Sequence, residues 1–205
     1  MKYENFVTPA GTAFYPNLRT PNMFEGNDLG FDCRVIFSEE DTEKMSEHLH
    51  KELAKAASLP EFAGKNLDAP DSFMGIGETK DGDMFFKFKT KSTYTTKAGE
   101  TLKRVIPIFD SNGKPLPKNV DIGHGSTVRV SYTIAPYYKS RKIKGIALYL
   151  NAVQVIKLVK RGEQGADSFG FGTVAGGYVS DEVADGEIPF GFGDDMGTTV
   201  EGADF

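Results

Sequence analysis

Hydrophobic residues recur at a helical spacing in one part of the chain, directly after a short polar start signal. Ser38 is followed by three acids at residues 39–41. This order is typical of a helix N-terminus, where a small polar side chain caps backbone N–H groups and acids favour the positive helix end. The apolar positions that follow, at spacings of four, four and three, are Met45, Leu49, Leu53 and Ala56. They predict one amphipathic helix, which Pro60 ends.

From Met84 onward the hydrophobic period changes to two, which is typical of β-strands. One predicted strand has Phe86, Phe88 and Thr90 on one face and Lys87, Lys89 and Lys91 on the other. A second has its apolar face at Val128, Val130, Tyr132 and Ile134. A long last strand has its apolar face at Ile146, Leu148, Leu150, Ala152, Ile156 and Leu158. We expect further strands at residues 31–37 and 102–109, and a turn at 110–113.

The remaining segments show no clear period. Residues 1–27 predict one strand followed by an irregular arm, and residues 60–83 predict a loop that Phe62, Phe73 and Met74 anchor. Several strands, one helix and mostly turn-type connections, without an alternating strand–helix pattern, indicate a mainly β protein. The expected fold is an OB-fold-like five-stranded barrel with one amphipathic helix.

Charge divides the chain into two parts. Residues 80–161 carry seventeen basic and five acidic side chains, although the whole chain has a formal net charge of −5. Residues 162–205 contain ten acidic side chains, eleven glycines and no lysine or arginine. We therefore expect a nucleic-acid-binding domain at 1–161 and an acidic tail at 162–205. The tail has too little apolar periodicity to offset its ordering entropy, so we expect it to be flexible and largely disordered.

Several classes of function are disfavoured. The single cysteine, Cys33, lies among apolar neighbours and is expected to be a buried strand thiol. The chain lacks clustered Cys and His ligands for zinc, and we predict no metal and no cofactor. Without a Ser/His/Asp set or paired carboxylates, an enzyme such as a small nuclease is disfavoured. No apolar run approaches the ~20 residues of a membrane span, and the N-terminus lacks a secretory stretch, so no membrane partner is expected.

The lysine series is the first feature that indicates a ligand. In a strand, Lys87, Lys89 and Lys91 share a face and stand about 6.6 Å apart. That spacing is close to the phosphate spacing of an extended single strand, so the three ammonium groups could follow a nucleic-acid backbone. The alternative, a solvated outer face, is about equally compatible with the pattern.

A second feature is the segment Tyr137-Tyr138-Lys139-Ser140-Arg141-Lys142-Ile143-Lys144, predicted as a loop between the last two strands. Flat rings beside cations suit a single strand, because rings stack on bases and charges hold phosphates. In an OB-type barrel this loop lines the binding groove. One tyrosine is expected to cap the barrel core and the other to be exposed. The full set of candidate nucleic-acid-binding residues is Lys87, Lys89, Lys91, Tyr94, Lys103, Arg129, Tyr137, Tyr138, Lys139, Arg141 and Lys142.

The acidic tail is the third feature. It contains Asp194 and Asp195 and ends in Asp204-Phe205, and we expect these four residues to bind protein partners. A terminal aromatic is a natural anchor for a partner pocket. A tethered anion can also occupy a cationic groove of the same chain, at an effective concentration around millimolar for a flexible linker.

The chain resembles the single-stranded DNA-binding proteins of tailed bacteriophages. The segments that carry the resemblance are residues 84–89 (MFFKFK), 108–114 (IFDSNGK), 122–130 (IGHGSTVRV), 135–138 (APYY) and the closing Asp204-Phe205. The resemblance implies sequence-tolerant binding of single-stranded DNA during phage replication, recombination and repair, in the cytoplasm of the infected host. It also implies tail contacts with the phage DNA polymerase and helicase/primase and competition between tail and DNA. Two departures are the Gly- and Phe-rich tail, without a long acidic run, and residues 60–83, which have no counterpart.

These observations leave two hypotheses. The leading one is a non-enzymatic protein that binds single-stranded DNA by stacking and backbone charge, with a homodimer as a further partner to consider. The alternative is a structural or assembly protein of a virion, whose Gly/Phe tail docks on neighbouring subunits. An assembly protein would form large particles indifferent to DNA, which separates the two.

Overall fold

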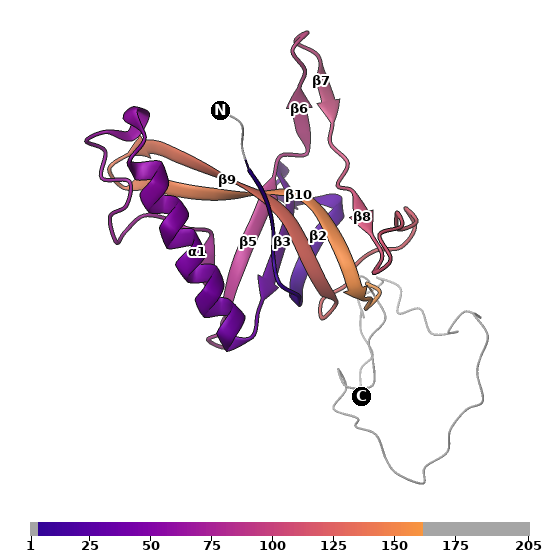
Figure 1. The fold of residues 1–205 in the computed structure, drawn as a ribbon. Helices are drawn as coiled ribbons and strands as arrows, with labels where there is room; N and C mark the ends of the chain where they lie inside the picture. Colours follow the sequence, from indigo (N-terminus) through magenta and orange to yellow (C-terminus); the bar gives the residue numbers. More distant parts are fainter. Residues whose placement is uncertain (1–3, 162–205) are drawn as a thin grey trace, which may run out of the picture. The chain divides into compact units, whose positions relative to one another are not determined.

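The computed structural model describes residues 4–161 and shows a barrel of strands with one long helix beside it (Figure 1). The strands of the main sheet are β1 (Asn5–Val7), β2 (Gly11–Phe24), β3 (Asn27–Ile36), β4 (Ile76–Glu78), β5 (Met84–Thr90), β8 (Ile108–Phe109), β9 (Thr127–Ser140) and β10 (Ile143–Lys157). The other elements are the helix α1 (Glu39–Ala57), the 3-10 helix η1 (Pro60–Phe62) and a separate hairpin of β6 (Thr93–Thr95) and β7 (Thr101–Lys103).

Five of these strands close into a ring. The order of hydrogen-bonded neighbours is β9-β2-β3-β5-β10, and β10 pairs with β9 again. All of these pairs are antiparallel except β5 with β10, which is parallel. This closed five-stranded arrangement confirms the predicted mainly β, OB-fold-like barrel. The short strands β1, β4 and β8 extend the wall at three places.

The barrel interior is filled by alternate side chains of the five strands, as the period of two requires. Val128, Val130 and Tyr132 of β9 are at most 1% exposed, and they meet Phe86 and Phe88 of β5. Cys33 of β3 is fully buried among them, and this burial raises the pKa of its thiol to about 12. The prediction of a buried strand thiol is therefore confirmed.

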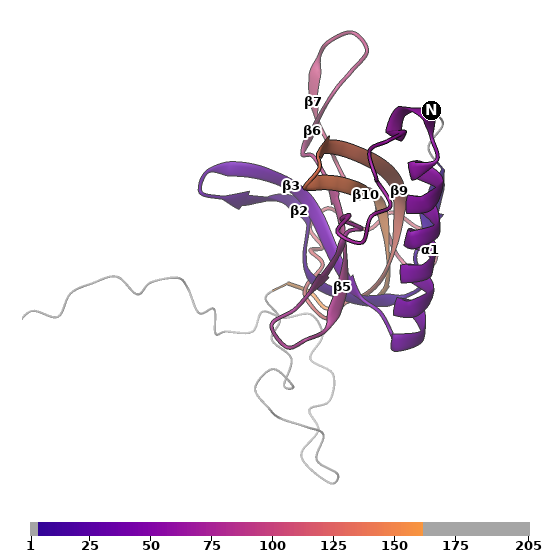
Figure 2. The same ribbon diagram turned by 90° about the vertical axis from the view of Figure 1, so that its left-hand side faces the viewer.

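Helix α1 begins where the sequence predicts. The Ser38 hydroxyl accepts a hydrogen bond from the Asp41 backbone N–H at 3.2 Å, so Ser38 is the N-cap. The buried face of the helix consists of the predicted stripe: Met45, Leu49, Leu53 and Ala56. Met45 reaches the barrel core, where its sulfur accepts a hydrogen bond from the Tyr132 hydroxyl at 3.9 Å. The helix therefore covers the core on one side of the barrel (Figures 1 and 2).

Three segments differ from the prediction. The expected irregular arm before residue 27 is mostly the long strand β2, whose register with β3 shifts repeatedly and so accommodates Pro16 and Pro21. The expected loop at 60–83 contains η1 and β4. The expected strand at 102–109 is divided into β7, which belongs to the hairpin, and β8, which pairs with β10.

The last strand also departs from a simple alternation. Its apolar face was predicted to continue through Ala152 and Ile156, but Val153 and Val155 are buried instead and Ile156 is 44% exposed. The cause is a register shift between Leu150 and Ala152 in the pairing with β9. Such a bulge inserts one residue and reverses which side chains face inward.

Two hairpins extend beyond the barrel. The β6–β7 hairpin projects at the top of Figure 1, and the β2–β3 hairpin projects away from α1 in Figure 2. No helix within residues 4–161 is long and apolar enough to cross a membrane. The predicted boundary after residue 161 and the acidic tail lie outside the described residues.

Candidate nucleic-acid interface

Lys87 and Lys89 of the predicted series lie on the outer face of β5, with the buried Phe86 and Phe88 on the inner face, and Lys91 directly follows the end of the strand. Strand pairing extends this face to both neighbours, since residues paired across a sheet share a side. Arg34 of β3 is paired with Lys87, and Tyr149 of β10 is paired with Lys89. The outer wall formed by β3, β5 and β10 therefore presents cations with an exposed tyrosine among them.

A groove of about 660 Å³ opens at the Lys87 end of this wall, and we name it the aromatic groove. It is lined by Phe14, Tyr15, Arg34, Glu78, Thr79, Lys80, Asp81, Phe85, Lys87 and His124. Four of these are rings and three are lysine or arginine. The sequence prediction had included only Lys87 of this set.

The rings of the aromatic groove contact one another. Tyr15 and His124 are stacked, with ring centroids 4.5 Å apart and an interplanar angle of 6°. Phe14 contacts both edge-on, at 4.8 Å and 5.2 Å. The Arg34 guanidinium lies 5.4 Å from the Phe85 ring centroid, within cation–π distance. Tyr15 is 60% exposed, so one face of this aromatic cluster is open to a ligand.

The backbone of Tyr15 is unusual, because its φ of +45° lies in the left-handed region that bulky side chains rarely adopt. Such conformations persist where surrounding contacts hold them, and they concentrate at functional sites. Here the following Pro16 is buried, and the Tyr15 ring is held against His124. The strain keeps a large ring on the surface of the barrel.

A buried carboxylate, Asp32, lies close to Arg34, one of the cations that line the aromatic groove. Asp32 is 2% exposed, accepts a hydrogen bond from the Asn17 amide at 3.0 Å, and lies 3.8 Å from the Arg34 Nε. Lys87, in the paired strand, is half-buried. Partial burial lowers its pKa, and the charges of Arg34 and Lys89 lower it further, while Asp32 opposes them. A phosphate bound near Lys87 would favour its charged form.

A second groove, of about 320 Å³, continues from Lys87 along the wall, and we name it the lysine groove. Its lining residues are Phe73, Lys87, Lys89, Thr90, Lys91, Ala147, Leu148 and Tyr149. Phe73 was expected to anchor a loop, but it is 48% exposed, and Tyr149 is 44% exposed. The two grooves share Lys87, so exposed rings and cations follow one another along β5.

Gly145 determines the position of Phe73. The backbone of Phe73 donates to the Lys144 carbonyl at 3.0 Å and accepts from the Ile146 N–H at 2.8 Å, on either side of Gly145. A Cβ on Gly145 would stand 2.0 Å from the Phe73 carbonyl oxygen, and its φ is +140°. Only glycine permits this approach, which holds the Phe73 ring beside the lysines.

The predicted loop at 137–144 is instead the end of the β9–β10 hairpin, with residues 141 and 142 at the turn. Tyr138 packs against the core, with the Lys65 ammonium 5.4 Å from its ring centroid, as expected for one of the two tyrosines. Tyr137 is only half-buried, and this burial raises its pKa. It is paired with Gly145, so its side chain shares a face with Ala147 of the lysine groove.

The cations of this hairpin fall into two groups. Lys139, Arg141 and Lys142 are exposed at its tip. Lys144 is 7% exposed and forms an ion pair with Asp71 at 3.0 Å, so its role is structural.

Three predicted residues lie elsewhere. Tyr94 and Lys103 belong to the separate β6–β7 hairpin, where the Arg104 guanidinium lies 5.3 Å from the Tyr94 ring centroid. The base of this hairpin is tied to the end of the lysine series, because Arg104 Nε donates to the Lys91 carbonyl at 3.1 Å. Arg129 lies on the outer face of β9 in a different groove, with its Nε bonded to the Thr8 carbonyl at 3.2 Å. The structure does not bring Arg129 to the lysine series.

The predicted partner-binding residues Asp194, Asp195, Asp204 and Phe205 lie outside the described residues. The sequence interpretation missed Tyr15, Arg34, Phe73, His124 and Tyr149. A signal for the first existed, since Phe14-Tyr15 is a pair of adjacent rings before a proline, like Tyr137-Tyr138. The others are single residues that only the tertiary structure brings together: strand register places Arg34 and Tyr149, and the backbone contact at Gly145 places Phe73.

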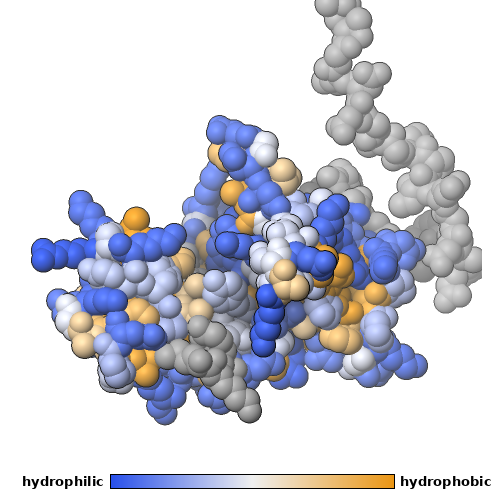
Figure 3. All heavy atoms as spheres, turned by 90° about the horizontal axis from the view of Figure 1, so that it is seen from above, coloured by the Kyte–Doolittle hydropathy of each residue, from blue (hydrophilic) through white to orange (hydrophobic). Residues whose placement is uncertain are grey.

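The face of the molecule that Figure 3 shows is mainly hydrophilic. Figure 3 views the molecule from above, onto the side of the β6–β7 hairpin, and shows hydrophobic patches separated by hydrophilic side chains. Within residues 4–161, no three His, Cys, Asp or Glu side chains are grouped to hold a metal ion. The chemistry that the two grooves offer is stacking, cation–π contact and charge.

Comparison with known sequences gives one family. A family model described as "Single-stranded DNA-binding protein, Bacteriophage T7" matches residues 34–158. The single-stranded DNA-binding protein of Enterobacteria phage T3 is 28% identical over 144 residues, covering 65% of this chain and 62% of that protein. The corresponding protein of Escherichia phage T7 is 28% identical over 127 residues, covering 61% and 54%. The match thus spans less than two thirds of either relative.

Solved structures show the same fold. The crystal structure of gp2.5, a single-stranded DNA-binding protein encoded by bacteriophage T7, superposes with a TM-score of 0.66 at 24% identity, covering 88% of this chain and all of that chain. A C-terminal truncation of the single-stranded DNA-binding protein from bacteriophage Enc34 gives 0.55 at 11% identity, covering 77% and 87%. At these identities the likeness concerns the fold.

Proposed function

Because the chain belongs to the bacteriophage T7 family of single-stranded DNA-binding proteins, we propose that it binds single-stranded DNA with little sequence preference and without catalysis. The observation that supports this most directly is the succession of exposed rings and cations along one wall of the barrel. Tyr15 and His124 open the series, Lys87 joins the two grooves, and Phe73 and Tyr149 flank the lysines.

In the proposed mechanism, aromatic side chains bind the bases and positively charged side chains bind the phosphates. Bases stack on the exposed rings, which contributes about 1–3 kcal/mol per base and tolerates any sequence because every base has a flat face. Phosphates follow Lys87, Lys89 and Lys91, with Arg34 beside them. The bases of a duplex are already stacked and paired, so a duplex cannot use the rings. We therefore propose a preference for single strands over duplexes.

We further propose that the protein acts in phage DNA replication, and in the recombination and repair that accompany it, in the cytoplasm of the infected host. The acidic tail, with Asp194, Asp195, Asp204 and Phe205, is the proposed contact for the phage DNA polymerase and helicase/primase. Its ten acids against the basic body support competition with DNA. Its glycines and phenylalanines dilute that charge, so we expect the competition to be modest.

Fluorescence titration of the full chain with single-stranded DNA, duplex DNA and single-stranded RNA oligonucleotides of equal length tests the binding proposal. Poly-dT and a mixed sequence should bind with similar affinity, and the duplex should bind more weakly at the same salt concentration. Equal affinity for duplex and single strand would contradict the stacking mechanism. Large assemblies that form regardless of DNA would instead support a virion assembly protein.

The tail proposal is tested with a chain that lacks its last ten or so residues. Removal should raise affinity for single-stranded DNA modestly and abolish capture of the phage polymerase. A truncated chain that binds DNA unchanged and still captures the polymerase would contradict the proposed role of the tail.

A further inference from the structure

The free end of the β2–β3 hairpin carries an exposed apolar tip. Met23 is 56% exposed, Phe24 61% and Leu29 38%. Pairing of β3 with β5 ends at Phe31, and β2 pairs with β9 at Gly11 and Thr12 alone. Residues 22–29 therefore extend beyond the barrel, and β2 and β3 pair only with each other there. We name the side chains of Met23, Phe24, Glu25 and Leu29 the hairpin tip.

The composition of the hairpin tip does not suit DNA. Residues 20–29 contain the acids Glu25 and Asp28 and no lysine or arginine, so phosphates would be repelled. Asp28 is already engaged by the Gly30 N–H at 2.7 Å and by the Ser92 hydroxyl. Glu25 remains as an exposed acid next to the exposed Phe24. Exposed apolar side chains grouped in this way are typical of a protein contact.

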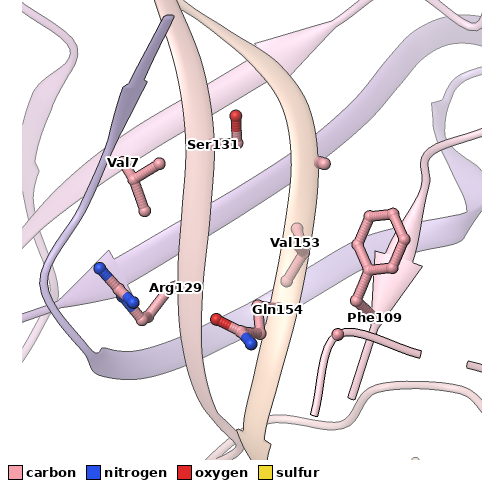
Figure 4. A pocket seen from close by; sticks show the side chains of 8 residues that line it. Val7, Phe109, Arg129, Ser131, Val153 and Gln154 are labelled. Atoms are coloured by element: carbon pink, nitrogen blue, oxygen red, sulfur yellow. The ribbon is translucent and has the colours of Figure 1, made fainter. Parts of the chain in front are cut away.

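A complementary groove lies on the wall of β9 and β10, between β1 and β8 (Figure 4). Its volume is about 400 Å³, and we name it the β9–β10 groove. Its lining residues are Val7, Phe109, Gly113, Arg129, Ser131, Ala152, Val153 and Gln154. The bulge between Leu150 and Ala152 lies in this wall, and Val7 is 55% exposed at the rim.

Arg129 gives the β9–β10 groove its charge. Its Nε is bonded to the Thr8 carbonyl, and within residues 4–161 its two Nη groups have no hydrogen-bond or ion-pair partner. The side-chain amide of Gln154, by contrast, already donates hydrogen bonds to the carbonyls of Asp110 and Ser111 at 3.2 Å and 3.3 Å. The groove thus combines an apolar lining with one cation that can bind a carboxylate.

We propose that the hairpin tip of one molecule inserts into the β9–β10 groove of a second copy of this chain. Phe24 and Met23 would contact Val7 and Phe109, and Glu25 would meet Arg129. A molecule cannot fill its own groove, because β3 pairs with β2 and β5 and lies across the ring from the β9–β10 wall. Figure 2 shows the hairpin extending away from the side that carries α1 and β9.

This contact joins two different surfaces, so each added copy leaves one free tip and one free groove. Such heterologous contacts build rings or open chains rather than closed pairs. Neither surface includes the lysine series or the exposed rings of the proposed DNA interface. Copies joined in this way can therefore coat one strand side by side, and binding to a strand with two sites becomes cooperative. This consequence rests on the proposed DNA-binding function.

The test uses three variants of the full chain. Phe24→Asp destroys the tip, Val7→Glu blocks the groove, and Val105→Asp is a matched control at a residue that is 72% exposed and belongs to neither surface. Each is titrated onto dT oligonucleotides with room for one or for two molecules. The ratio of doubly to singly bound strands is counted by native mass spectrometry. The parent and the control should show cooperative double occupancy, and each surface variant should reduce it about tenfold or more.

A mixture of the two surface variants identifies the contact. The Phe24→Asp copy keeps its groove and the Val7→Glu copy keeps its tip, so mixed pairs should recover cooperative binding. The proposal would be overturned if the parent filled the two sites of a strand independently of each other. It would also be overturned if Phe24→Asp lost cooperative binding and the mixture did not restore it. A symmetric tip-to-tip dimer would leave Val7→Glu unaffected and would also overturn it. Unchanged affinity of both variants for the one-site strand separates these results from a failure of DNA binding itself.

Discussion

Tyr15 illustrates how the conformation of one residue supports the proposed DNA interface. Its ring is stacked on His124 on one side and open on the other, and its backbone adopts a left-handed φ that costs of order 1–3 kcal/mol for a non-glycine residue. A tyrosine in this position contributes little to the core. The strain is explained if the exposed ring stacks on a base.

We predict that Tyr15→Ala weakens binding of single-stranded DNA by about 1–3 kcal/mol, or about 5- to 150-fold, with little change in the salt dependence. The reason is that the ring contributes stacking and carries no charge. Phe24→Ala is the matched control, since Phe24 is also about 60% exposed and belongs to the same hairpin. Fluorescence titrations at several salt concentrations on a one-site oligonucleotide measure both quantities. Equal losses of DNA affinity in Tyr15→Ala and Phe24→Ala would show that Tyr15 does not contact DNA.

Lys87 is a residue at which we expect a cost in folding stability and a contribution to DNA binding. Its pKa is lowered by partial burial and by neighbouring cations, so the folded state disfavours the charged form. The unfolded chain then binds the proton more tightly than the folded chain. The resulting destabilisation is present below the lowered pKa and disappears as pH rises through the interval up to the unfolded value.

We predict that Lys87→Met raises the melting temperature slightly at pH 7 and weakens DNA binding. Removal of one phosphate contact should reduce the salt slope by about 0.7. Differential scanning calorimetry and salt-dependent titrations give the two readouts. A variant that is less stable than the parent would contradict the sign of the pKa argument.

The same lowered pKa predicts a pH dependence of binding. A phosphate near Lys87 favours its charged form, so affinity should fall as pH rises through the lowered pKa. Lys87→Arg, which stays charged, should keep its affinity over that alkaline range. Titrations of the parent and Lys87→Arg between pH 7 and about 10 measure the difference, with the melting curve at each pH as the control for folding. Identical pH profiles would show that Lys87 does not contact phosphate.

At the scale of elements, the β9–β10 hairpin separates two neighbouring tyrosines. Alternation along β9 directs Tyr138 toward the core and Lys65, and places Tyr137 on the face of the lysine groove. The two rings are adjacent in sequence but belong to opposite sides of the strand. Their substitution should therefore affect different properties.

We predict that Tyr137→Ala lowers affinity for single-stranded DNA with a nearly unchanged melting temperature. Tyr138→Ala should lower stability by about 2–4 kcal/mol, within the range for large-to-small changes at packed positions, with a smaller effect on affinity. Thermal melts and one-site titrations of both variants test this pair. If Tyr137→Ala instead lowered stability and Tyr138→Ala lowered affinity, the strand register at the hairpin end would have to be different.

At the scale of the whole molecule, the charges are separated in space as well as in sequence. The outer face of α1 carries Lys44, Lys51 and Lys55 among many acids, and two of the three are paired with Glu40 and Glu52. Within residues 4–161, by contrast, Lys87, Lys89 and Lys91 form no ion pair with a carboxylate, and the buried Asp32 acts on Lys87 through its charge alone. Equal numbers of lysines on the two faces therefore produce different electrostatic potentials at the surface.

We predict that replacing Lys87, Lys89 and Lys91 together by glutamine reduces the salt slope of binding by about 2, at about 0.7 per contact. Replacing the three α1 lysines in the same way changes the net charge equally and should leave the slope almost unchanged. Titrations from 50 to 200 mM salt compare the two triple variants. Similar slopes would mean that net charge, rather than the β5 wall, governs binding.

Local pattern alone determined much of the fold. The period of two in residues 84–90 and 127–134 and the apolar stripe from Met45 to Ala56 were sufficient to place strands, helix and buried faces, because these periods follow from backbone geometry. The N-cap at Ser38, the buried Cys33 and the lysine face of β5 depend on the same local rules. All of them are found as predicted.

Only the tertiary structure decided which residues meet. A bulge at Leu150 reversed the inward face of β10, and shifts in β2 made a strand of a proline-containing arm. Register between distant strands placed Arg34 beside Lys87 and Tyr149 beside Lys89, and moved Arg129 to another wall. The close approach at Gly145 put Phe73 among the lysines. Periodicity tells which side of its own strand a residue faces, but pairing across the closed barrel decides its neighbours, and that pairing is a property of the whole fold.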